Sequence, residues 1–313
     1  MHPINIHPIA DGHITIALAA YNSEDTIEEA VRSILGQNYT NFDLYVVDDA
    51  STDGTLDVLH RLLPEDDRLH VIHLEKNGGT YSAKNLVLRE FCRGEFFALM
   101  DADDLSWPER LESQIDYLRA NWNTAACGTG VDEFFKSYYD FPGTPSHHPV
   151  TFDPQDDHYH RKNTYKPFFA QGACFGMDTS GMRTLKVCKN GSLLFRSKEL
   201  KALGGWDGRV AAAADTELLF RLMLFHDLGN LQEPLYSRRF HPSSLTRTPE
   251  YGHQSDFRID YLTEAYKRIQ RLKPHFEAED WKLLRTETTY DCYVADSPYQ
   301  LYHHGSLKPV IVA

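Results

Sequence analysis

The segment 96–104 constrains this chain more than any other, because an apolar run stops abruptly at a group of carboxylates. The acids are Asp101, Asp103 and Asp104. Such a pattern predicts a buried strand that delivers acids to a site. Two carboxylates one residue apart at a strand end can reach one hard divalent ion, Mg²⁺ or Mn²⁺, which then holds a phosphate. An acidic turn that caps the next helix is the simpler alternative, so the rest of the chain has to decide between them.

Buried strands and one-sided helices alternate before this segment. The strand expected over 14–20 ends at the polar turn Tyr21-Asn22-Ser23, and the strand expected over 44–47 ends in Asp48 and Asp49. Between them, apolar residues over 27–35 fall on one face of a helical period. A helix over 55–63, a strand over 69–74, a glycine turn at 77–79 and a helix over 80–91 follow. This order predicts a parallel sheet covered by helices, whose strand ends bring acids to one site.

Five groups of residues then follow one another in a characteristic order and spacing. They are 14–22, 46–55, Asn77-Gly78-Gly79 with Ala83-Lys84-Asn85, 100–104, and 203–207 followed by Asp215. Together they span roughly residues 13–222 and resemble the inverting family 2 glycosyltransferases. The resemblance implies an α/β GT-A fold: a Rossmann-like, mostly parallel central sheet flanked by helices. An acceptor-side insertion and a helical C-terminal extension complete the expected architecture.

The resemblance also implies a role for individual residues. Those expected to bind the nucleotide sugar are Ala20, Tyr21, Asn22, Asp49, Lys84, Asp101 and Ala102. Among them, Asp49 is expected to contact the nucleotide base. Asp101 and Asp103 would form the Asp-x-Asp motif that holds Mn²⁺ or Mg²⁺, and Asp215 would be the catalytic base. Trp206 and Asp207 would lie over the donor and acceptor sugars. His241, in a segment rich in basic and hydroxyl side chains, is a further candidate for the metal.

Three positions depart from the family pattern. Ala20 replaces the usual proline. Lys84 replaces an arginine, so a phosphate there would meet a compact ammonium group instead of a bidentate guanidinium. Ala214 stands where the family has a glutamate before the base. Asp215 would open a helix over 211–226, where the helix dipole alone could explain an acid. Likewise, Gly204-Gly205-Trp206 could be only a helix C-cap with a buried aromatic residue.

Composition narrows the function further. The net charge of −13 argues against a nucleic-acid partner, and no apolar run is long enough for a transmembrane span. The amino-terminal residues lack the pattern of a signal peptide. Five cysteines without a Cys-x-x-Cys motif favour the cytoplasm. Peripheral association with the inner face of a membrane stays open, as does the oligomeric state.

The expected organisation is a catalytic domain over 1–250 and a helical C-terminal extension over 251–313. The nucleotide-sugar half would cover about 13–130 and the acceptor half about 131–250. A proline-rich insertion over 134–172 would shape the acceptor pocket, since long loops tend to be functional. Its histidines are expected to be solvated residues and not a zinc site.

The sequence therefore predicts a metal-dependent inverting glycosyltransferase that moves a sugar from a nucleoside diphosphate donor, with UDP-sugar as the expected donor, to a hydroxyl of a glycan or lipid-linked acceptor. A non-catalytic module that binds sugar nucleotides or glycans on the same fold is the alternative. A nucleotidyltransferase would want a glycine-rich, basic loop after the first strand, where this chain is acidic at Glu24 and Asp25.

Overall fold

The computed structural model describes most of the chain: residues 10–135, 163–165, 176–177, 183–184, 188–240, 245, 248–253, 255–304 and 306–312. Most of the insertion predicted over 134–172, with its histidines, lies outside these ranges, and so does His241. None of the helices in the described ranges is both long and apolar enough to cross a membrane.

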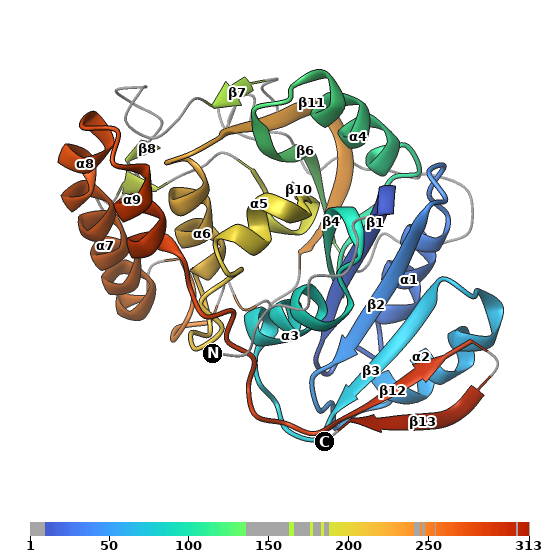
Figure 1. Cartoon of the computed structure of the whole chain (residues 1–313). Coiled ribbons are helices and arrows are strands. Elements are labelled where there is room, and N and C mark those ends of the chain that lie inside the picture. The colour runs from blue at the N-terminus through green and yellow to red at the C-terminus, as the bar shows by residue number, and fades with distance from the viewer. Residues whose placement is uncertain are drawn as a thin grey trace.

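Helices and strands alternate along the chain as the sequence predicts (Figure 1). The strands are β1 (Ala10–Ala20), β2 (Phe42–Asp48), β3 (Leu69–Leu74), β4 (Gly94–Asp101), β5 (Leu105–Ser106), β6 (Thr124–Phe135), β7 (Asn163–Tyr165), β8 (Gly176–Met177), β9 (Arg183–Thr184), β10 (Leu194–Arg196), β11 (Asp227–Phe240), β12 (Tyr299–His303) and β13 (Ser306–Val312). The helices are α1 (Ile27–Leu35), α2 (Thr55–Leu62), α3 (Thr80–Leu86), α4 (Arg110–Ala120), α5 (Ser197–Ala202), α6 (Ala214–Leu222), α7 (Asp256–Arg271), α8 (Lys273–Glu277) and α9 (Trp281–Thr288).

One large sheet organises the described residues, in the order β13-β12-β3-β2-β1-β4-β10-β6-β11-β5. The strands from β3 to β4 in this order are parallel, β10 and β12 join them antiparallel, and β6 runs parallel to β11. The register pairs Ala20 with Asp48 and Ala19 with Asp101. The carboxyl ends of β1, β2 and β4 therefore lie side by side, as the sequence predicts.

Strand β4 shows how one segment serves both faces of the sheet. Phe96, Ala98 and Met100 pack with the helices α1, α2 and α4, while Phe97 and Leu99 pack with α3 and α6 on the other face. All five side chains are fully buried. This alternation follows from the two-residue period of a strand, and it leaves Asp101 as the first residue of the run that is not buried in the core.

The carboxyl-terminal region is not helical throughout, which corrects the extension predicted over 251–313. Helices α7, α8 and α9 form within the predicted range, and Ile269 and Leu284 join the core. The chain then returns as β12, which pairs antiparallel with β3 from Tyr299 to His303. This pairing covers the edge of β3 and leaves β13 as the outermost strand on that side, a tertiary arrangement with no local sequence signal.

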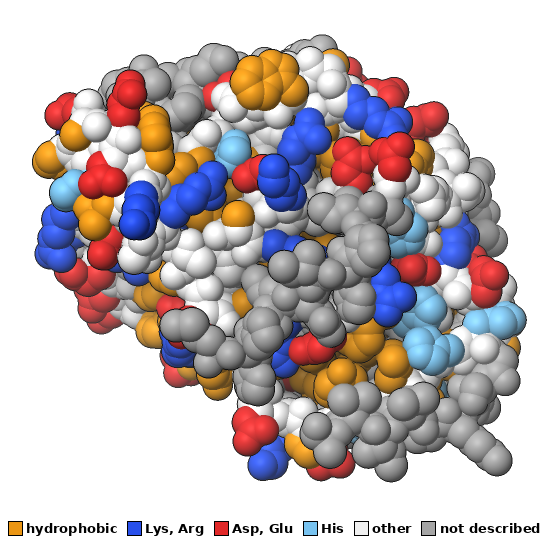
Figure 2. Space-filling model, viewed as in Figure 1, with side chains coloured by type: hydrophobic (Ala, Val, Ile, Leu, Met, Phe, Trp, Pro, Cys, Tyr) orange, Lys and Arg blue, Asp and Glu red, His pale blue; other side chains and the backbone are white. Residues whose placement is uncertain are grey.

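Figure 2 shows that acidic and basic side chains are interspersed over one face of the molecule. Histidines gather on the side where α2 and β3 lie in Figure 1.

Helix α6 is shorter than the helix predicted over 211–226. It starts after Ala213, whose positive φ of 73° interrupts the helical backbone.

Candidate active site

The loops that follow β1 and β2 are joined by hydrogen bonds. The backbone N–H of Asp49 donates to the carbonyl of Ala20 at 2.8 Å, and the side-chain oxygen of Asn22 accepts from the N–H of Thr52 at 2.8 Å. Ala20 is buried, whereas half of the Tyr21 surface is exposed. Of the residues predicted in this turn, Tyr21 and Asn22 are exposed, and the Asn22 oxygen is already bonded to Thr52.

Asp49 shapes the glycine turn before α3. Its carboxylate accepts from the backbone N–H groups of Gly78 at 2.7 Å and Gly79 at 2.8 Å, and only 3% of the residue is exposed. Burial raises the pKa of Asp49 above its ordinary value although both N–H groups oppose that shift. The contact with a nucleotide base stays a prediction.

Asp101 lies at the end of β4 among cations. Its Oδ1 is 3.4 Å from Nζ of Lys84, and 26% of the carboxylate side chain is exposed. Burial alone would raise the pKa of Asp101, but Lys84, Lys189 and Arg238 lower it below the ordinary value. An ionised carboxylate beside several cations suits a ligand that brings both a divalent ion and phosphate groups.

Asp104 differs from the other two acids because it is a structural anchor. It is buried, and it accepts from the Tyr236 hydroxyl at 2.8 Å and from the Arg239 backbone N–H at 2.7 Å. Burial, with the charge of Asp103, raises the pKa of Asp104 well above its ordinary value. The anchor fixes the acidic loop to β11 and leaves the partly exposed Asp101 and Asp103 as the acids that can face a ligand. Ala102, between them, is buried.

Gly191 allows a second segment to close against the acidic loop. A Cβ built on Gly191 would lie 2.6 Å from Oδ2 of Asp101 and would also clash with the Tyr236 hydroxyl. Because a side chain cannot fit there, only glycine permits this close approach. The approach brings the neighbouring Lys189 toward the carboxylates.

Asp215 occupies the first turn of α6, as predicted. Its Oδ1 accepts from the Tyr81 hydroxyl at 3.2 Å and from the Thr216 backbone N–H at 2.9 Å. The residue is partly exposed, and the dipole of the helix favours an anion at this end. A partly exposed carboxylate that few donors hold can accept a proton from a hydroxyl group.

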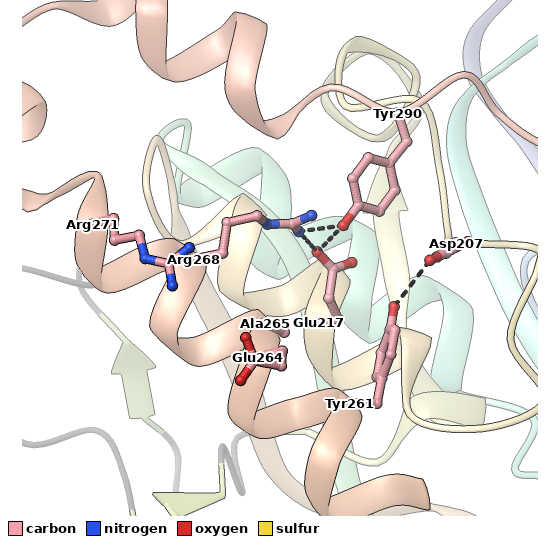
Figure 3. A pocket seen from close by; sticks show the side chains of 8 residues that line it. All are labelled: Asp207, Glu217, Tyr261, Glu264, Ala265, Arg268, Arg271 and Tyr290. Atoms are coloured by element: carbon pink, nitrogen blue, oxygen red, sulfur yellow. Dashed lines mark hydrogen bonds and ion pairs between the residues drawn. The ribbon is translucent and has the colours of Figure 1, made fainter.

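Glu217 takes part in a buried network that lines a cleft between α6 and α7 (Figure 3). It accepts from Nε of Arg221 at 3.0 Å, from the Tyr290 hydroxyl at 2.7 Å and from Arg268. Only 1% of Glu217 is exposed, which makes it a poor base. Asp207 lines the same cleft and accepts from the Tyr261 hydroxyl at 3.4 Å.

The Trp206 side chain lies in the core, which does not support the prediction that it lies over the sugars. It is fully buried, with its ring centroid 5.9 Å from that of Phe195. The positive φ values of Gly204 and Gly205 turn the backbone so that the indole points into the core. Asn85 holds the Trp206 backbone on both sides, donating to its carbonyl at 2.9 Å and accepting from its N–H at 3.0 Å.

Sequence reasoning missed three residues that organise the site. Tyr81 contacts Asp215, Asn85 fixes the turn at Trp206, and Tyr236 binds Asp104. A signal for the first two exists, because Tyr81, Lys84 and Asn85 stand at positions i, i+3 and i+4 of one helix and so share a face. Tyr236 carries no such signal, since a tyrosine in a strand is ordinary.

Comparison with known proteins identifies the class. The model of the family described as Glycosyl transferase family 2 matches residues 15–185, more than half of the chain. The chain therefore belongs to glycosyl transferase family 2.

Curated relatives match over a shorter segment. The teichuronic acid biosynthesis glycosyltransferase TuaG of Bacillus subtilis is 37% identical over 105 residues, 34% of this chain and 41% of TuaG. The UDP-Glc:alpha-D-GlcNAc-diphosphoundecaprenol beta-1,3-glucosyltransferase WfaP of Escherichia coli is 33% identical over 105 residues, with the same two shares. The matched segment spans less than half the length of these relatives.

Solved structures support the GT-A fold. S. aureus TarS 1-349 in complex with UDP aligns with a TM-score of 0.54 at 20% identity, covering 73% of this chain and 61% of the other. The mannosyltransferase PcManGT from Pyrobaculum calidifontis, in complex with GDP-Man and Mn²⁺, aligns with a TM-score of 0.56 at 20% identity, covering 88% and 72%.

Proposed function

We propose that this chain is an inverting, metal-dependent glycosyltransferase. It transfers a sugar from a nucleoside diphosphate donor, UDP-linked, to a hydroxyl of a glycan or lipid-linked acceptor. One observation carries the proposal: Asp101, at the carboxyl end of β4, lies among cations with Asp103 two residues further on, and α3 joins this edge to a separate, partly exposed carboxylate, Asp215. This separation gives the leaving group and the acceptor hydroxyl different partners.

The residues at the strand ends fit a Mg²⁺ or Mn²⁺ ion. The described residues assemble no group of three or more metal-ligating side chains. Mg²⁺ is usually bound through one or two carboxylates together with substrate phosphates and water, so Asp101 and Asp103 are a sufficient protein contribution. When bound, such an ion neutralises the charge that develops on the diphosphate as the anomeric bond breaks.

The chain's own residues would supply the other steps. Lys84, beside Asp101, places a positive charge next to the diphosphate, and Asp49 with the exposed Tyr21 would bind the nucleoside. Asp215 would take the proton of the acceptor hydroxyl, on the face of the sugar opposite the leaving group, which inverts the anomeric centre. Asp207 would contact a sugar, whereas the buried Trp206 would not.

The comparisons favour this choice of substrates. The TarS structure contains UDP, and WfaP is named for a UDP-sugar and a diphosphoundecaprenol acceptor. A lipid-linked acceptor would place the chain in the cytoplasm at the inner face of a membrane. The alternative, a non-catalytic binding module, is motivated by Ala214, which removes the acid that usually precedes the base.

A thermal-shift panel of nucleoside diphosphates and sugar nucleotides, with Mn²⁺ or with EDTA, tests the proposal. A ligand at a hundredfold excess over its Kd stabilises the folded state by about 2.7 kcal/mol. UDP should shift the midpoint with Mn²⁺, and Asp103→Ala should remove this shift. Asp116→Ala, an exposed aspartate on α4, is the matched control. An equal shift in EDTA would refute the metal role, and binding without any release of UDP from a UDP-sugar would favour the binding module.

A further inference from the structure

Helix α3 connects the two halves of the site through one face. Tyr81, Lys84 and Asn85 lie on this face and contact Asp215, Asp101 and the Trp206 backbone, respectively. All three residues are almost completely buried. A single short helix therefore contacts Asp101, which is proposed to bind the metal, and Asp215, the proposed catalytic base. It also contacts the turn at Trp206, which lies between them in the sequence.

The position of this face depends on Asp49. The carboxylate of Asp49 binds the N–H groups of Gly78 and Gly79, immediately before the first residue of α3. Tyr81 is the second residue of the helix, so a shift of the turn would carry its hydroxyl with it. Asp49, which we propose to contact the nucleotide base, is thus connected by a short backbone segment to Tyr81, which contacts Asp215.

The hydrogen bonds at Asp215 are asymmetric. The Tyr81 hydroxyl and the Thr216 N–H both donate to Oδ1, and Oδ2 receives no hydrogen bond from the residues that the structure describes. Burial raises the pKa of Tyr81 well above its ordinary value, so the phenol stays a proton donor. Arg258 of α7 and His253 are charged or titratable groups close to this pair.

We propose that Tyr81 is a positioning residue that holds Oδ1 of Asp215, so that Oδ2 faces the acceptor hydroxyl. The inference rests on the proposed function, because it assumes that Asp215 is the base. Tyr81 orients the carboxylate through the hydroxyl alone and does not touch the reacting atoms. Through the Asp49 turn, the orientation of the base is coupled to the nucleotide end of the site.

The first test is Tyr81→Phe, which keeps the buried ring and removes the hydroxyl. Turnover of the UDP-sugar, followed as released UDP, should fall about 10-fold, while KM for the donor and the Kd for UDP stay unchanged. Tyr302→Phe is the matched control, because Tyr302 is also buried and its hydroxyl donates to Gln300 on the far edge of the sheet. Full turnover in Tyr81→Phe, or a UDP affinity weakened as much as kcat, would overturn the proposal.

A double-mutant cycle tests whether Tyr81 acts through Asp215. In an Asp215→Asn background, Tyr81→Phe should cause no further loss of turnover, because the carboxylate it orients is gone. The same 10-fold loss in that background would show that Tyr81 acts elsewhere.

A readout without turnover separates this inference from the proposed function. In protein labelled with ¹³C at the aspartate carboxyl carbons, the Asp215 signal is assigned by its loss in Asp215→Asn. The Tyr81 hydroxyl polarises the carboxylate to which it donates, so Tyr81→Phe should change the chemical shift of this signal at a fixed pH, whereas Tyr302→Phe should leave it unchanged. An unchanged chemical shift overturns the inference. A changed chemical shift in a protein that turns over no UDP-sugar supports the contact and overturns only the proposed function.

Discussion

Asp215 and Glu217 lie two residues apart in the first turn of α6, yet they belong to different regions of the molecule. Successive residues of a helix are about 100° apart, so the two carboxylates point in nearly opposite directions. Asp215 faces α3 and has one side-chain donor among the residues that the structure describes, the Tyr81 hydroxyl. Glu217 faces α7 and has three, Arg221, Arg268 and Tyr290. The number of donors that each carboxylate has distinguishes a reactive group from a structural one.

The region around Glu217 uses its charges to join segments. Arg221 is fully buried and donates to the carbonyls of Leu203 at 2.7 Å, Gly205 at 2.7 Å and Thr288 at 3.3 Å, besides its pair with Glu217. A buried ion pair is stable only if further hydrogen bonds satisfy its remaining atoms, and these carbonyls do so. The network therefore ties the glycine turn before Trp206 and the end of α9 to α6.

The largest effect is expected on stability, from removing the charge of Glu217, the structural acid of the two. Glu217→Ala leaves Arg221 buried without its anion, which should lower the free energy of unfolding by about 3 to 5 kcal/mol. Urea denaturation of the purified variant measures this change. Glu264→Ala is the control, because Glu264 lines the same cleft but is exposed and pairs with Lys267 at the surface. Equal stability of the two variants would mean that the network around Glu217 does not stabilise the fold.

Asp215→Asn should have the opposite profile. The asparagine keeps the shape of the side chain but removes the proton acceptor, so sugar transfer at saturating donor should fall by at least about 10²-fold. The free energy of unfolding should change by less than about 0.5 kcal/mol, because the residue is partly exposed and the asparagine oxygen can still accept from the Tyr81 hydroxyl. Near-normal transfer with intact UDP binding would move the base to Asp207, since Glu217 is already fully bonded.

The sequence predicts this site well where the chemistry is local. Asp101 and Asp103 follow an apolar strand, and the one-sided helices around them fix the parallel sheet, so the convergence of the strand ends could be foreseen. Trp206 could not, because its burial depends on Phe195 and Asn85, which approach it only in the folded chain. The pairing of β12 with β3 is a tertiary contact of the same kind.

A smaller effect, on the affinity for UDP, is expected at Asp49. This acid holds the turn before α3, as a structural residue does, and is also proposed to contact the ligand. Asp49→Ala removes the acceptor for two backbone N–H groups and the predicted partner of the nucleotide base. UDP should therefore bind about 1 to 3 kcal/mol more weakly. Titration calorimetry with Mn²⁺ measures the affinity. An unchanged Kd would rule out Asp49 as a contact of the nucleotide and leave it a purely structural acid.

The smallest effect concerns ionisable groups at the far edge of the sheet. Nδ1 of His303 on β12 lies 2.9 Å from Nδ1 of His70 on β3, so one ring must accept the hydrogen bond that the other donates. His70 in turn contacts Asp43, which also pairs with His13. Burial and the neighbouring His70 lower the pKa of His303 below its ordinary value. Like Glu217, this cluster is expected to affect stability and not catalysis.

The sign of the pH effect follows from that shift. Because the folded state favours neutral His303, the unfolded chain binds more protons, and stability is present above the unfolded pKa of about 6.5 and is lost as pH falls below it. The loss should stay under about 1 kcal/mol, since the ring is partly exposed and screened by solvent. Thermal unfolding between about pH 5 and 7.5 measures it. His303→Gln should flatten this dependence, and His275→Gln on α8 should not. If His303→Gln left the slope unchanged but altered the pH profile of sugar transfer, the division between structural and reactive ionisable groups would fail at this edge.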